Sequence, residues 1–426
     1  MTRKLLDDCF AHDQVRLSHD AAVDLLRSRV SVIADAQTVP LTAAGGRIIA
    51  EAVSAPRPVP AHTNAAVDGY SFAASAYDRA AGSTLPVAAR VAAGAGSIAA
   101  GPGAAAAARI FTGAVMPDGH DTVAMQEDCE AIEGAGKALV RIPPGLKAGA
   151  NVRKAGEDVA AGHVLFEPGA VLRPQDLAAL ASIGKSEVRV HRRLRVGILS
   201  SGDEVVRVGA ALAHGEVYDA NMPMLQALIT SAGADAIDLG VAPDRAEAVE
   251  ATLAAAARDC DVIVTSGGAS KGEEDHMVHA LERLGQRHLW QLAIKPGRPM
   301  SFGQIGDSVV LGLPGNPVAV LVCFLLYAWP LLRRMGGAPW PEPRRFMLPA
   351  AFEFAGRKKG RREFWRGMYA TIGDRMAVDK FARDGSGLIS GLRAADGLID
   401  IPEDAGDVQR GDLVAFIPFT EFGILR

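Results

Sequence analysis

The stretch RVGILSSGDE at residues 195–204 decides the fold of the larger part of the chain. Its apolar run predicts a buried strand, and the serines, glycine and acids that follow predict a turn. Strand and helix patterns alternate from here onward, which predicts a parallel, doubly wound α/β sheet. Further strands are predicted at residues 236–241, 261–265, 288–292 and 309–311, and helices at 222–231, 245–258, 275–284 and from Pro317.

The segments on either side of this α/β part have different patterns, so we expect an α/β multidomain chain. Helices are predicted at residues 21–29, 42–52 and 174–183, which places 1–55 and 151–192 in one discontinuous helical domain. Short apolar runs between glycine-rich turns predict a β-rich domain inserted at 56–150. The α/β domain is expected at 193–340, and a C-terminal β-barrel domain at 341–426, beyond a boundary marked by two prolines.

The composition excludes several classes of protein. The 45 Lys and Arg nearly balance the 49 Asp and Glu, which argues against nucleic acid as a partner. The four cysteines form no C-x-x-C pair, so we expect free thiols in a reducing cytoplasm. No secretory h-region is visible near the start. The most apolar run, Val318 to Trp329, is short for a bilayer span and predicts a buried helix rather than a membrane partner.

Acidic side chains recur in the turns that follow the predicted parallel strands. Glu204, Asp219, Asp244 and Asp275 all lie there, and ligands bind at this edge of doubly wound sheets. Hard carboxylate oxygens brought together suit Mg²⁺. Each acid taken alone is also compatible with a helix cap, and this alternative stays open for Asp244 and Asp275.

The same edge carries features that suit an anion. The turn Ser266-Gly267-Gly268 can present backbone N–H groups to a phosphate, and Asn316 before Pro317 marks a helix start. Lys295 and Arg298 lie in a proline-rich loop, where they would lose little entropy on binding an oxyanion. A plain helix start and a solvated surface are the alternatives.

Two stretches outside the α/β part are also candidates. NAAVDGY at residues 64–70 is, as a bare pattern, a turn around Asp68. The run 357–366 contains six basic residues, Arg361 among them, next to Phe364 and Trp365. It is either a solvated surface or part of an anion-binding site. His276 and His279 lack a third zinc ligand, so a surface pair is favoured.

Taken together, these motifs resemble the MoeA/gephyrin family, the molybdopterin molybdenumtransferases. They follow the family's order and cover nearly the whole chain. Gln291 departs from the pattern, because many bacterial relatives have lysine there. The matching stretches are NAAVDGY (64–70), RIFTGA (109–114), RKAGED (153–158), SGDE (201–204), YDAN (218–221), TSGGASKGEED (265–275), IKPGRP (294–299) and GLPGNP (312–317).

The resemblance implies an elongated homodimer of four-domain chains, in which the α/β domain binds molybdopterin. It also implies a reaction: molybdate is inserted into adenylylated molybdopterin, AMP is released, and Mg²⁺ is required. Contact with the molybdopterin adenylyltransferase is a candidate interaction. Tungstate is near-isosteric with molybdate and stays open as a substrate.

The resemblance further implies roles for individual residues. The acids Asp68, Glu204, Asp244 and Asp275 are expected to be catalytic, and the last three to hold the metal. The residues expected to bind substrate are Thr112, Asp158, Ser266, Gly267, Gly268, Lys295, Arg298, Pro314, Asn316, Pro317, Arg361 and Ser386.

Other functions are less consistent with the sequence. A molybdopterin adenylyltransferase would be expected to have a Gly-Gly-Thr-Gly turn, whereas Ala269 and Ser270 follow the two glycines here. A receptor-clustering scaffold would be expected to have extra domains and a long linker, and neither is seen in this sequence. A Mg²⁺-dependent phosphohydrolase remains an alternative on the carboxylates alone.

Overall fold

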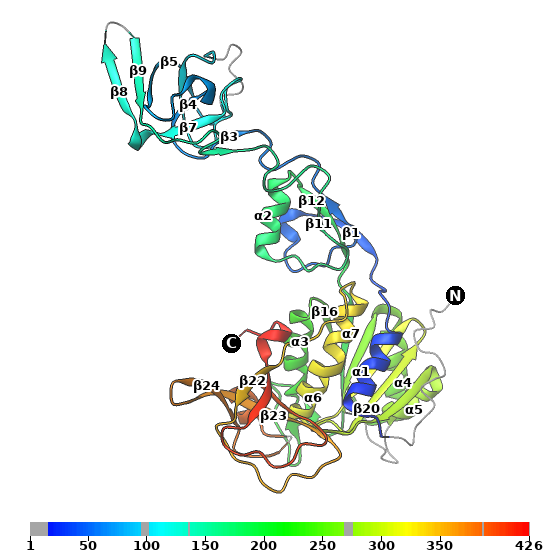
Figure 1. Ribbon diagram of the computed structural model, residues 1–426. Coiled ribbons are helices and arrows are strands. Elements are labelled where there is room, and N and C mark those ends of the chain that lie inside the picture. Colours follow the sequence, from blue (N-terminus) through cyan, green and yellow to red (C-terminus); the bar gives the residue numbers. More distant parts are fainter. Residues whose placement is uncertain (1–15, 95–101, 135–136, 268–275, 386, 426) are drawn as a thin grey trace.

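The computed structural model describes residues 16–94, 102–134, 137–267, 276–385 and 387–425. The molecule is elongated, and it has a β-rich head, a neck and a base that holds an α/β unit and a C-terminal β unit (Figure 1). The head runs from β3 to β10, and the neck contains β1, β2, β11, α2 and β12.

A six-stranded sheet forms the centre of the α/β unit. The four neighbouring strands β16, β13, β17 and β21 are parallel, as predicted. The remaining two, β20 and β18, run antiparallel to their neighbours. The prediction of a wholly parallel sheet was therefore wrong at this edge, where β20 had not been predicted. Only two residues separate β20 from β21, which is too short for a parallel crossover. The strand order is β16 (Asp235–Ala242), β13 (Arg195–Ser201), β17 (Val262–Ser266), β21 (Ser308–Leu313), β20 (Pro299–Ile305) and β18 (Gln286–Gln291).

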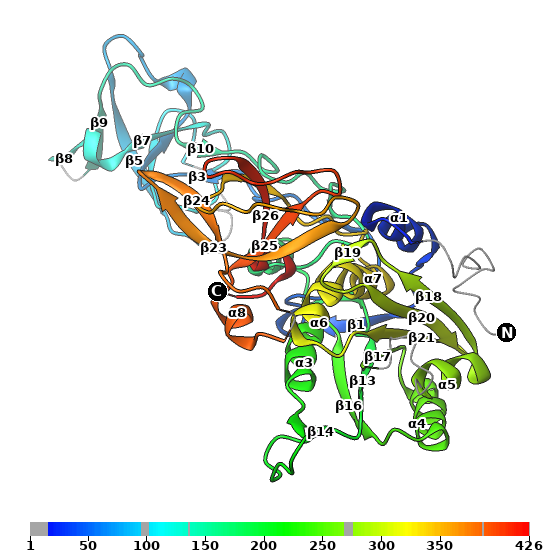
Figure 2. The ribbon, with the colours of Figure 1, turned by 90° about the horizontal axis from the view of Figure 1, so that it is seen from below.

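Helices cover both faces of this sheet, because successive strand residues point to opposite sides. On β17, Val264 enters one core with Leu225 of α3, whereas Ile263 enters a second core with Leu253 of α4 and Met277 of α5. The doubly wound arrangement follows from this alternation. The helices are α3 (Asn221–Ser231), α4 (Ala246–Asp259), α5 (His276–Leu284), α6 (Pro317–Cys323) and α7 (Trp329–Met335). A small pair, β14 (Val205–Val206) and β15 (Val217–Tyr218), extends from the same unit (Figure 2).

The apolar run after Pro317 forms a longer helix than its sequence suggested. Helix α6 continues through a π-helical segment at Phe324–Ala328 into α7, and Pro330 is accommodated directly after that wider turn. The continuous stretch Pro317–Met335 is 19 residues long and apolar enough to cross a membrane by length and composition. Of its most apolar window, 89% is buried within the protein, so it is the core helix that was predicted, although the expectation of a short run was wrong.

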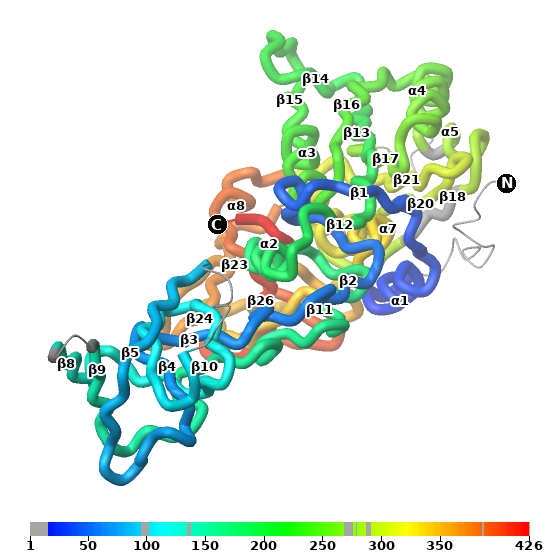
Figure 3. Tube along the Cα trace, turned by 90° about the horizontal axis from the view of Figure 1, so that it is seen from above, coloured from blue at the N-terminus to red at the C-terminus, as the bar shows by residue number. Residues whose placement is uncertain are grey.

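The first helix and the neck differ from the expected helical domain. Helix α1 (His19–Arg29) forms as predicted, but Ala22 and Leu26 pack into the core of the α/β unit. No α-helix forms over 42–52, because Gly46 adopts a left-handed conformation (φ +72°), and Ile48 and Ile49 make β-bridges instead. Helix α2 (Pro174–Ser182) is the one α-helix among the described neck residues (Figure 3). The neck strands pair as β1 (Ala36–Pro40) with β12 (Glu187–His191), and as β2 (Val53–Ser54) with β11 (Val164–Phe166).

The head is β-rich, as predicted. Its six-stranded sheet has the order β7-β4-β6-β5-β9-β8, and a short pair, β3 and β10, lies beside it. Short 3-10 turns occur at Ala74–Ala76 and Gln126–Asp128. The strands are β3 (Asn64–Ala65), β4 (Gly69–Phe72), β5 (Ser83–Val91), β6 (Ala107–Ile110), β7 (Thr122–Met125), β8 (Glu130–Gly134), β9 (Lys137–Ile142) and β10 (Val152–Arg153).

The C-terminal β unit packs directly against the α/β unit (Figure 2). Strand β19 leaves the α/β unit and pairs in parallel with β23, which joins the two units through backbone hydrogen bonds. A bridge between Ala350 and Val378 brings the end of β22 beside β24. The elements are β19 (Ile294–Lys295), β22 (Phe346–Pro349), β23 (Arg362–Ile372), β24 (Arg375–Lys380), α8 (Ile389–Ala394), β25 (Gly397–Ile401), β26 (Leu413–Pro418) and a 3-10 turn at Phe419–Phe422.

Candidate active site

The turns at the carboxyl ends of the parallel strands are tied together by one side chain. Asn221, the first residue of α3, donates from Nδ2 to Ser266 Oγ and to the Gly315 carbonyl oxygen, both at 2.7 Å. It thereby links the turn after β17 to the turn after β21. Sequence reasoning did not assign Asn221 a role, although the residue lies in one of the motifs that carry the resemblance.

Gly267 meets a steric requirement in the first of these turns. Its φ is +97°, and a Cβ there would come within 3.1 Å of both the Oγ and the carbonyl oxygen of Ser201. Gly267 N donates to the Leu313 carbonyl oxygen at 3.1 Å, so this backbone N–H is not available to a ligand. Gly268, predicted to follow it in the site, lies outside the described residues.

Asp219 is a structural acid at this edge. Its Oδ2 accepts a 2.6 Å hydrogen bond from the Ser200 hydroxyl, and its Oδ1 accepts one of 3.0 Å from Met222 N at the start of α3. The carboxylate is buried. Asp219 thus caps the helix, the role that was the alternative for every acid in this group.

Glu204 and Asp244 are exposed on adjacent turns. Asp244 N donates to Asp203 Oδ1 at 2.9 Å, which joins the turn after β16 to the turn after β13. The Glu204 carboxylate folds back over its own turn and lies close to Gly202. The third predicted metal ligand, Asp275, lies outside the described residues, and no group of three metal-ligating side chains occurs within those that are described.

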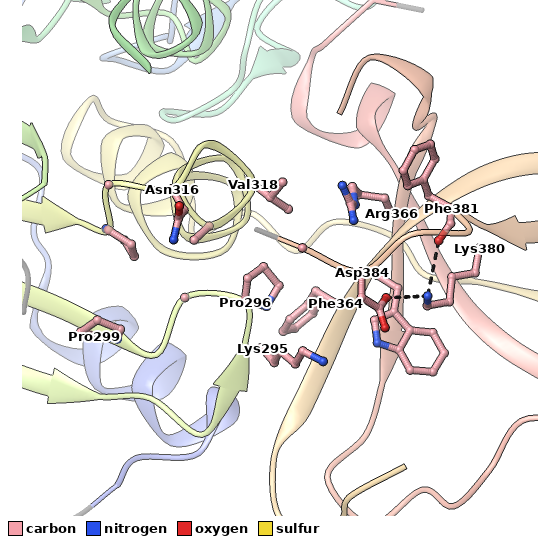
Figure 4. A pocket seen from close by; sticks show the side chains of 16 residues that line it. Lys295, Pro296, Pro299, Asn316, Val318, Phe364, Arg366, Lys380, Phe381 and Asp384 are labelled. Atoms are coloured by element: carbon pink, nitrogen blue, oxygen red, sulfur yellow. Dashed lines mark hydrogen bonds and ion pairs between the residues drawn. The ribbon is translucent and has the colours of Figure 1, made fainter. Parts of the chain in front are cut away.

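A pocket of about 540 Å³ opens between the α/β unit and the C-terminal β unit, next to this edge. Figure 4 shows Pro296, Asn316 and Val318 on one side and Arg366, Lys380 and Phe381 on the other. Of the predicted residues, Lys295, Pro314 and Asn316 line the pocket, whereas Arg298, Pro317 and Arg361 do not. Ser386 lies outside the described residues.

Asn316 contributes its side chain to the pocket rather than to the helix that follows. It occupies the N-cap position of α6, yet its side chain makes no capping hydrogen bond. The expected helix start at Asn316 and Pro317 is therefore confirmed, although the Asn316 side chain does not bond to the first turn of α6. Its Oδ1 faces the C-terminal unit, 3.9 Å from where a Cβ on Gly387 would lie.

The far wall of the pocket carries two further cations. Arg366 donates to the carbonyl oxygens of Leu388 (3.2 Å) and Arg383 (2.6 Å), and burial lowers its pKa. Lys380 pairs with Asp384 at 2.7 Å and lies over the Trp365 ring. Sequence reasoning noticed the basic run and its aromatic neighbours, but it had no signal for Lys380 and Asp384, because only the strand pairing brings them here.

Behind the pocket, one buried carboxylate contacts two of the predicted cations. Glu363 Oε1 accepts from Arg361 Nε at 3.1 Å, and Oε2 lies 3.8 Å from Lys295 Nζ. Trp365 Nε1 donates to Oε2 at 2.9 Å. Sequence reasoning missed Glu363, which stands as a lone acid within the basic run.

Two of the remaining predicted residues, Asp68 and Thr112, contact each other in the head, whereas Asp158 follows the last strand of the head. Asp68 Oδ1 accepts hydrogen bonds of 2.7 Å from both the backbone N and the hydroxyl of Thr112. These bonds, together with the charge of Arg109, lower the pKa of Asp68. Asp158 is exposed, and its backbone N donates to the Val59 carbonyl oxygen. The head lies far from the base, so a single chain does not bring these residues to the pocket (Figure 1).

Comparisons with known proteins agree with this architecture. Residues 17–184 match the MoeA N-terminal region (domain I and II), residues 197–334 a probable molybdopterin binding domain, and residues 348–419 the MoeA C-terminal region (domain IV). The solved structure of the molybdopterin biosynthesis MoeA protein from Pyrococcus horikoshii OT3 superposes with a TM-score of 0.80 at 27% identity, and covers 95% of this chain and 100% of that one.

Curated relatives carry the name of an activity. The molybdopterin molybdenumtransferase of Haemophilus influenzae is 37% identical over 381 residues, which are 89% of this chain and 93% of the relative. Molybdopterin molybdenumtransferase 2 of Mycobacterium tuberculosis is 34% identical over 389 residues, 88% of this chain and 93% of the relative. The chain belongs to the MoeA family of molybdopterin molybdenumtransferases and is an enzyme of molybdenum cofactor biosynthesis.

Proposed function

We propose that this enzyme inserts molybdenum from molybdate into adenylylated molybdopterin and releases AMP. One observation carries the proposal: the turn Pro314-Gly315-Asn316 belongs to both parts of the site. Gly315 is bound by Asn221 at the sheet edge, while all three residues line the pocket. A substrate with an adenylyl group at the glycine-rich edge would therefore extend its other end into the pocket.

The charges of the pocket suit an oxyanion next to an anhydride. Lys295 and Arg366 line the pocket and supply positive charge, and Arg298 and Arg361 add to it from outside the lining. The aromatic rings of Phe364 and Trp365 give the same wall an apolar surface. In the proposed first step a molybdate oxygen attacks the adenylyl phosphorus and the anhydride bond to the pterin's phosphate breaks, which gives adenylyl molybdate and molybdopterin. In the second step the dithiolene sulfurs bond to molybdenum, the bond between molybdenum and the adenylyl oxygen breaks, and AMP leaves.

We propose that Mg²⁺ is held by Glu204, Asp244 and Asp275. The donor set fits the ion, because Glu204 and Asp244 are exposed carboxylates on turns that Asp203 joins. When bound, Mg²⁺ would act as a Lewis acid toward the anhydride oxygens. Asp68 is proposed as a further catalytic carboxylate, with Thr112 and Asp158 as substrate contacts.

The split between head and base supports a homodimer. A second copy would place Asp68 and Thr112 of the head, together with Asp158 just beyond the head, at the cleft of its partner. We propose this arrangement, together with a cytoplasmic location and a contact with the molybdopterin adenylyltransferase. We further propose four domains with the bounds 1–55 with 151–192, 56–150, 193–340 and 341–426, of which helix α1 in the first packs into the α/β unit, and closure of the C-terminal unit into a barrel.

The test is to incubate the protein with adenylylated molybdopterin, with and without molybdate, and to measure AMP. Molybdate-dependent AMP release in the wild type, lost in Asp68→Ala and Glu204→Ala with the fold retained, supports the proposal. Unchanged turnover in both variants would contradict the site assignment. ATP consumption with free molybdopterin would indicate an adenylyltransferase, and hydrolysis of generic phosphate esters a phosphohydrolase.

A further inference from the structure

We infer that Glu363 is a positioning residue for the pocket and that its carboxylate sets the orientation of Lys295. This inference rests on the proposed function, since it assigns Lys295 to binding of an oxyanion. Glu363 is itself absent from the pocket lining and 2% exposed, so it acts through other side chains.

The carboxylate of Glu363 divides its two oxygens among three partners. Oε2 accepts from Trp365 Nε1 and lies near Lys295 Nζ, and both of these residues line the pocket. Oε1 accepts from Arg361 on the other side. Since the side chains of Lys295 and Arg361 are 44% and 37% exposed, neither is held in place by close packing alone.

The backbone places this carboxylate beside Lys295 by strand register. Lys295 of β19 pairs with Glu363 of β23 in a parallel ladder. The pairing fixes the distance between the two backbones, and the half-exposed side chain of Lys295 stays accessible to a ligand. The 3.8 Å separation of Nζ and Oε2 is longer than a hydrogen bond, so the ammonium can turn toward an anion without breaking one.

A glutamine cannot replace this arrangement. The carboxylate accepts at both oxygens, whereas an amide has one oxygen and one NH₂ group. In Glu363→Gln, the NH₂ group would face either Arg361 or the Trp365 and Lys295 pair, so one side loses its acceptor. Lys295 also loses the negative charge that restrains it, and its freed rotamers must be ordered again when an anion binds.

The chain offers a matched control in Asp400 on the neighbouring strand β25. Asp400 is 1% exposed and also holds two cations, accepting from Arg362 at 2.6 and 2.9 Å and from Arg345 at 2.9 Å. Neither of these arginines lines the pocket. Asp400→Asn therefore removes a buried charge from the same sheet without releasing a cation of the pocket.

The experiment measures KM for molybdate and kcat in the AMP-release assay, together with thermal unfolding of each variant. We expect Glu363→Gln to raise KM for molybdate about tenfold, with a smaller change in kcat. Loss of the Glu363 charge by itself favours an anion, so the raised KM reports the lost positioning of Lys295. The KM of the variant should also rise more steeply with salt, because the anion now meets one more uncompensated positive charge that salt screens. Asp400→Asn should lose stability but keep KM within about twofold of wild type.

Glu363→Asp keeps the charge on a side chain one methylene shorter. It should restore the wild-type salt dependence while KM stays raised, and it serves as the test if the glutamine variant does not fold. An unchanged KM in Glu363→Gln, or equal KM shifts in Glu363→Gln and Asp400→Asn, would overturn the inference. Absence of molybdate-dependent AMP release in the wild type would instead contradict the proposed function.

Discussion

Asn221 donates a 2.7 Å hydrogen bond to Ser266, and this bond fastens the start of α3 to the turn that follows β17. Asn221 is buried, and its Oδ1 has no partner in the described part of the chain. The side chain therefore holds the edge of the sheet through its amide nitrogen alone.

The first prediction concerns this amide. Asn221→Ala removes both donated hydrogen bonds, and we expect a loss of about 1–2 kcal/mol in the free energy of unfolding. The loss stays this small because the substitution also removes the buried Oδ1, which has no partner in the described part of the chain. The turns at Ser266 and Gly315 are then no longer joined, so kcat/KM should fall by at least about tenfold. Urea unfolding and the AMP assay measure these effects. Thr230→Ala, near the exposed end of α3, is the control, and wild-type turnover in Asn221→Ala would contradict the prediction.

The second prediction compares two glycines that lie close together at the sheet edge. Gly267→Ala forces a methyl group to within 3.1 Å of Ser201 and keeps φ at +97°, so we expect about 1–2 kcal/mol of destabilisation. Among the described residues, a Cβ on Gly315 would come within 4 Å of the Cα of Gly267 alone, at 3.9 Å. Gly315→Ala should therefore unfold within about 0.5 kcal/mol of the wild type. Equal unfolding midpoints for the two variants would show that the left-handed turn is not required.

The third prediction concerns the ionisation of Asp68. The backbone N–H of Thr112 is the main cause of its lowered pKa, followed by the Thr112 hydroxyl. A carbon-13 NMR titration should place the Asp68 carboxyl below the ordinary 3.8. Thr112→Val keeps the backbone donor and should return only part of the shift. A pKa at or above the ordinary value in the wild type would mean that the two hydrogen bonds do not persist in solution.

The fourth prediction concerns stability against pH at His19. Burial, followed by the charge of Arg362, lowers the pKa of His19 from 6.5 to about 4. The folded state thus favours the neutral ring, whose Nδ1 lies 3.0 Å from the Tyr327 hydroxyl. The stabilisation is complete above pH 6.5 and is lost as the pH falls toward 4, by on the order of 3 kcal/mol.

Unfolding free energies between pH 4 and pH 7 measure this effect. His19→Gln carries no titratable group and should show a shallower dependence over the same range. If the two slopes are the same, other groups account for the acid sensitivity.

Much of the α/β unit could be predicted because its strands are short continuous apolar runs between turn residues. Strand β20 escaped prediction, since the residues from Pro299 to Ile305 mix polar and apolar side chains and its pairing depends on a two-residue turn. The helix expected at 42–52 failed because a local apolar period was outweighed by Gly46 and by partners distant in the sequence, such as Val190.

The candidate site could be predicted as a set of residues but not as an arrangement. Motif spacing identified Lys295, Asn316 and Asp68, and it placed Asp68 in the inserted β-rich domain, but it could not show how far the head lies from the pocket (Figure 1). Glu363 and Asn221 act through contacts between elements that are far apart in sequence. Such contacts follow from strand register and helix packing, and no local pattern in the sequence encodes them.

The parallel pairing of β19 with β23 has a mechanical consequence for the pocket. Ile294 and Lys295 are in register with Arg362 and Glu363, and Arg362 N donates to the Ala293 carbonyl oxygen at 2.8 Å. The two walls of the pocket are thus joined by backbone hydrogen bonds at one end and can separate only at the other. A substrate must therefore enter and leave through the open side, by motion of side chains and loops. The spacing of the walls at the end where β19 pairs with β23 stays fixed through the catalytic cycle.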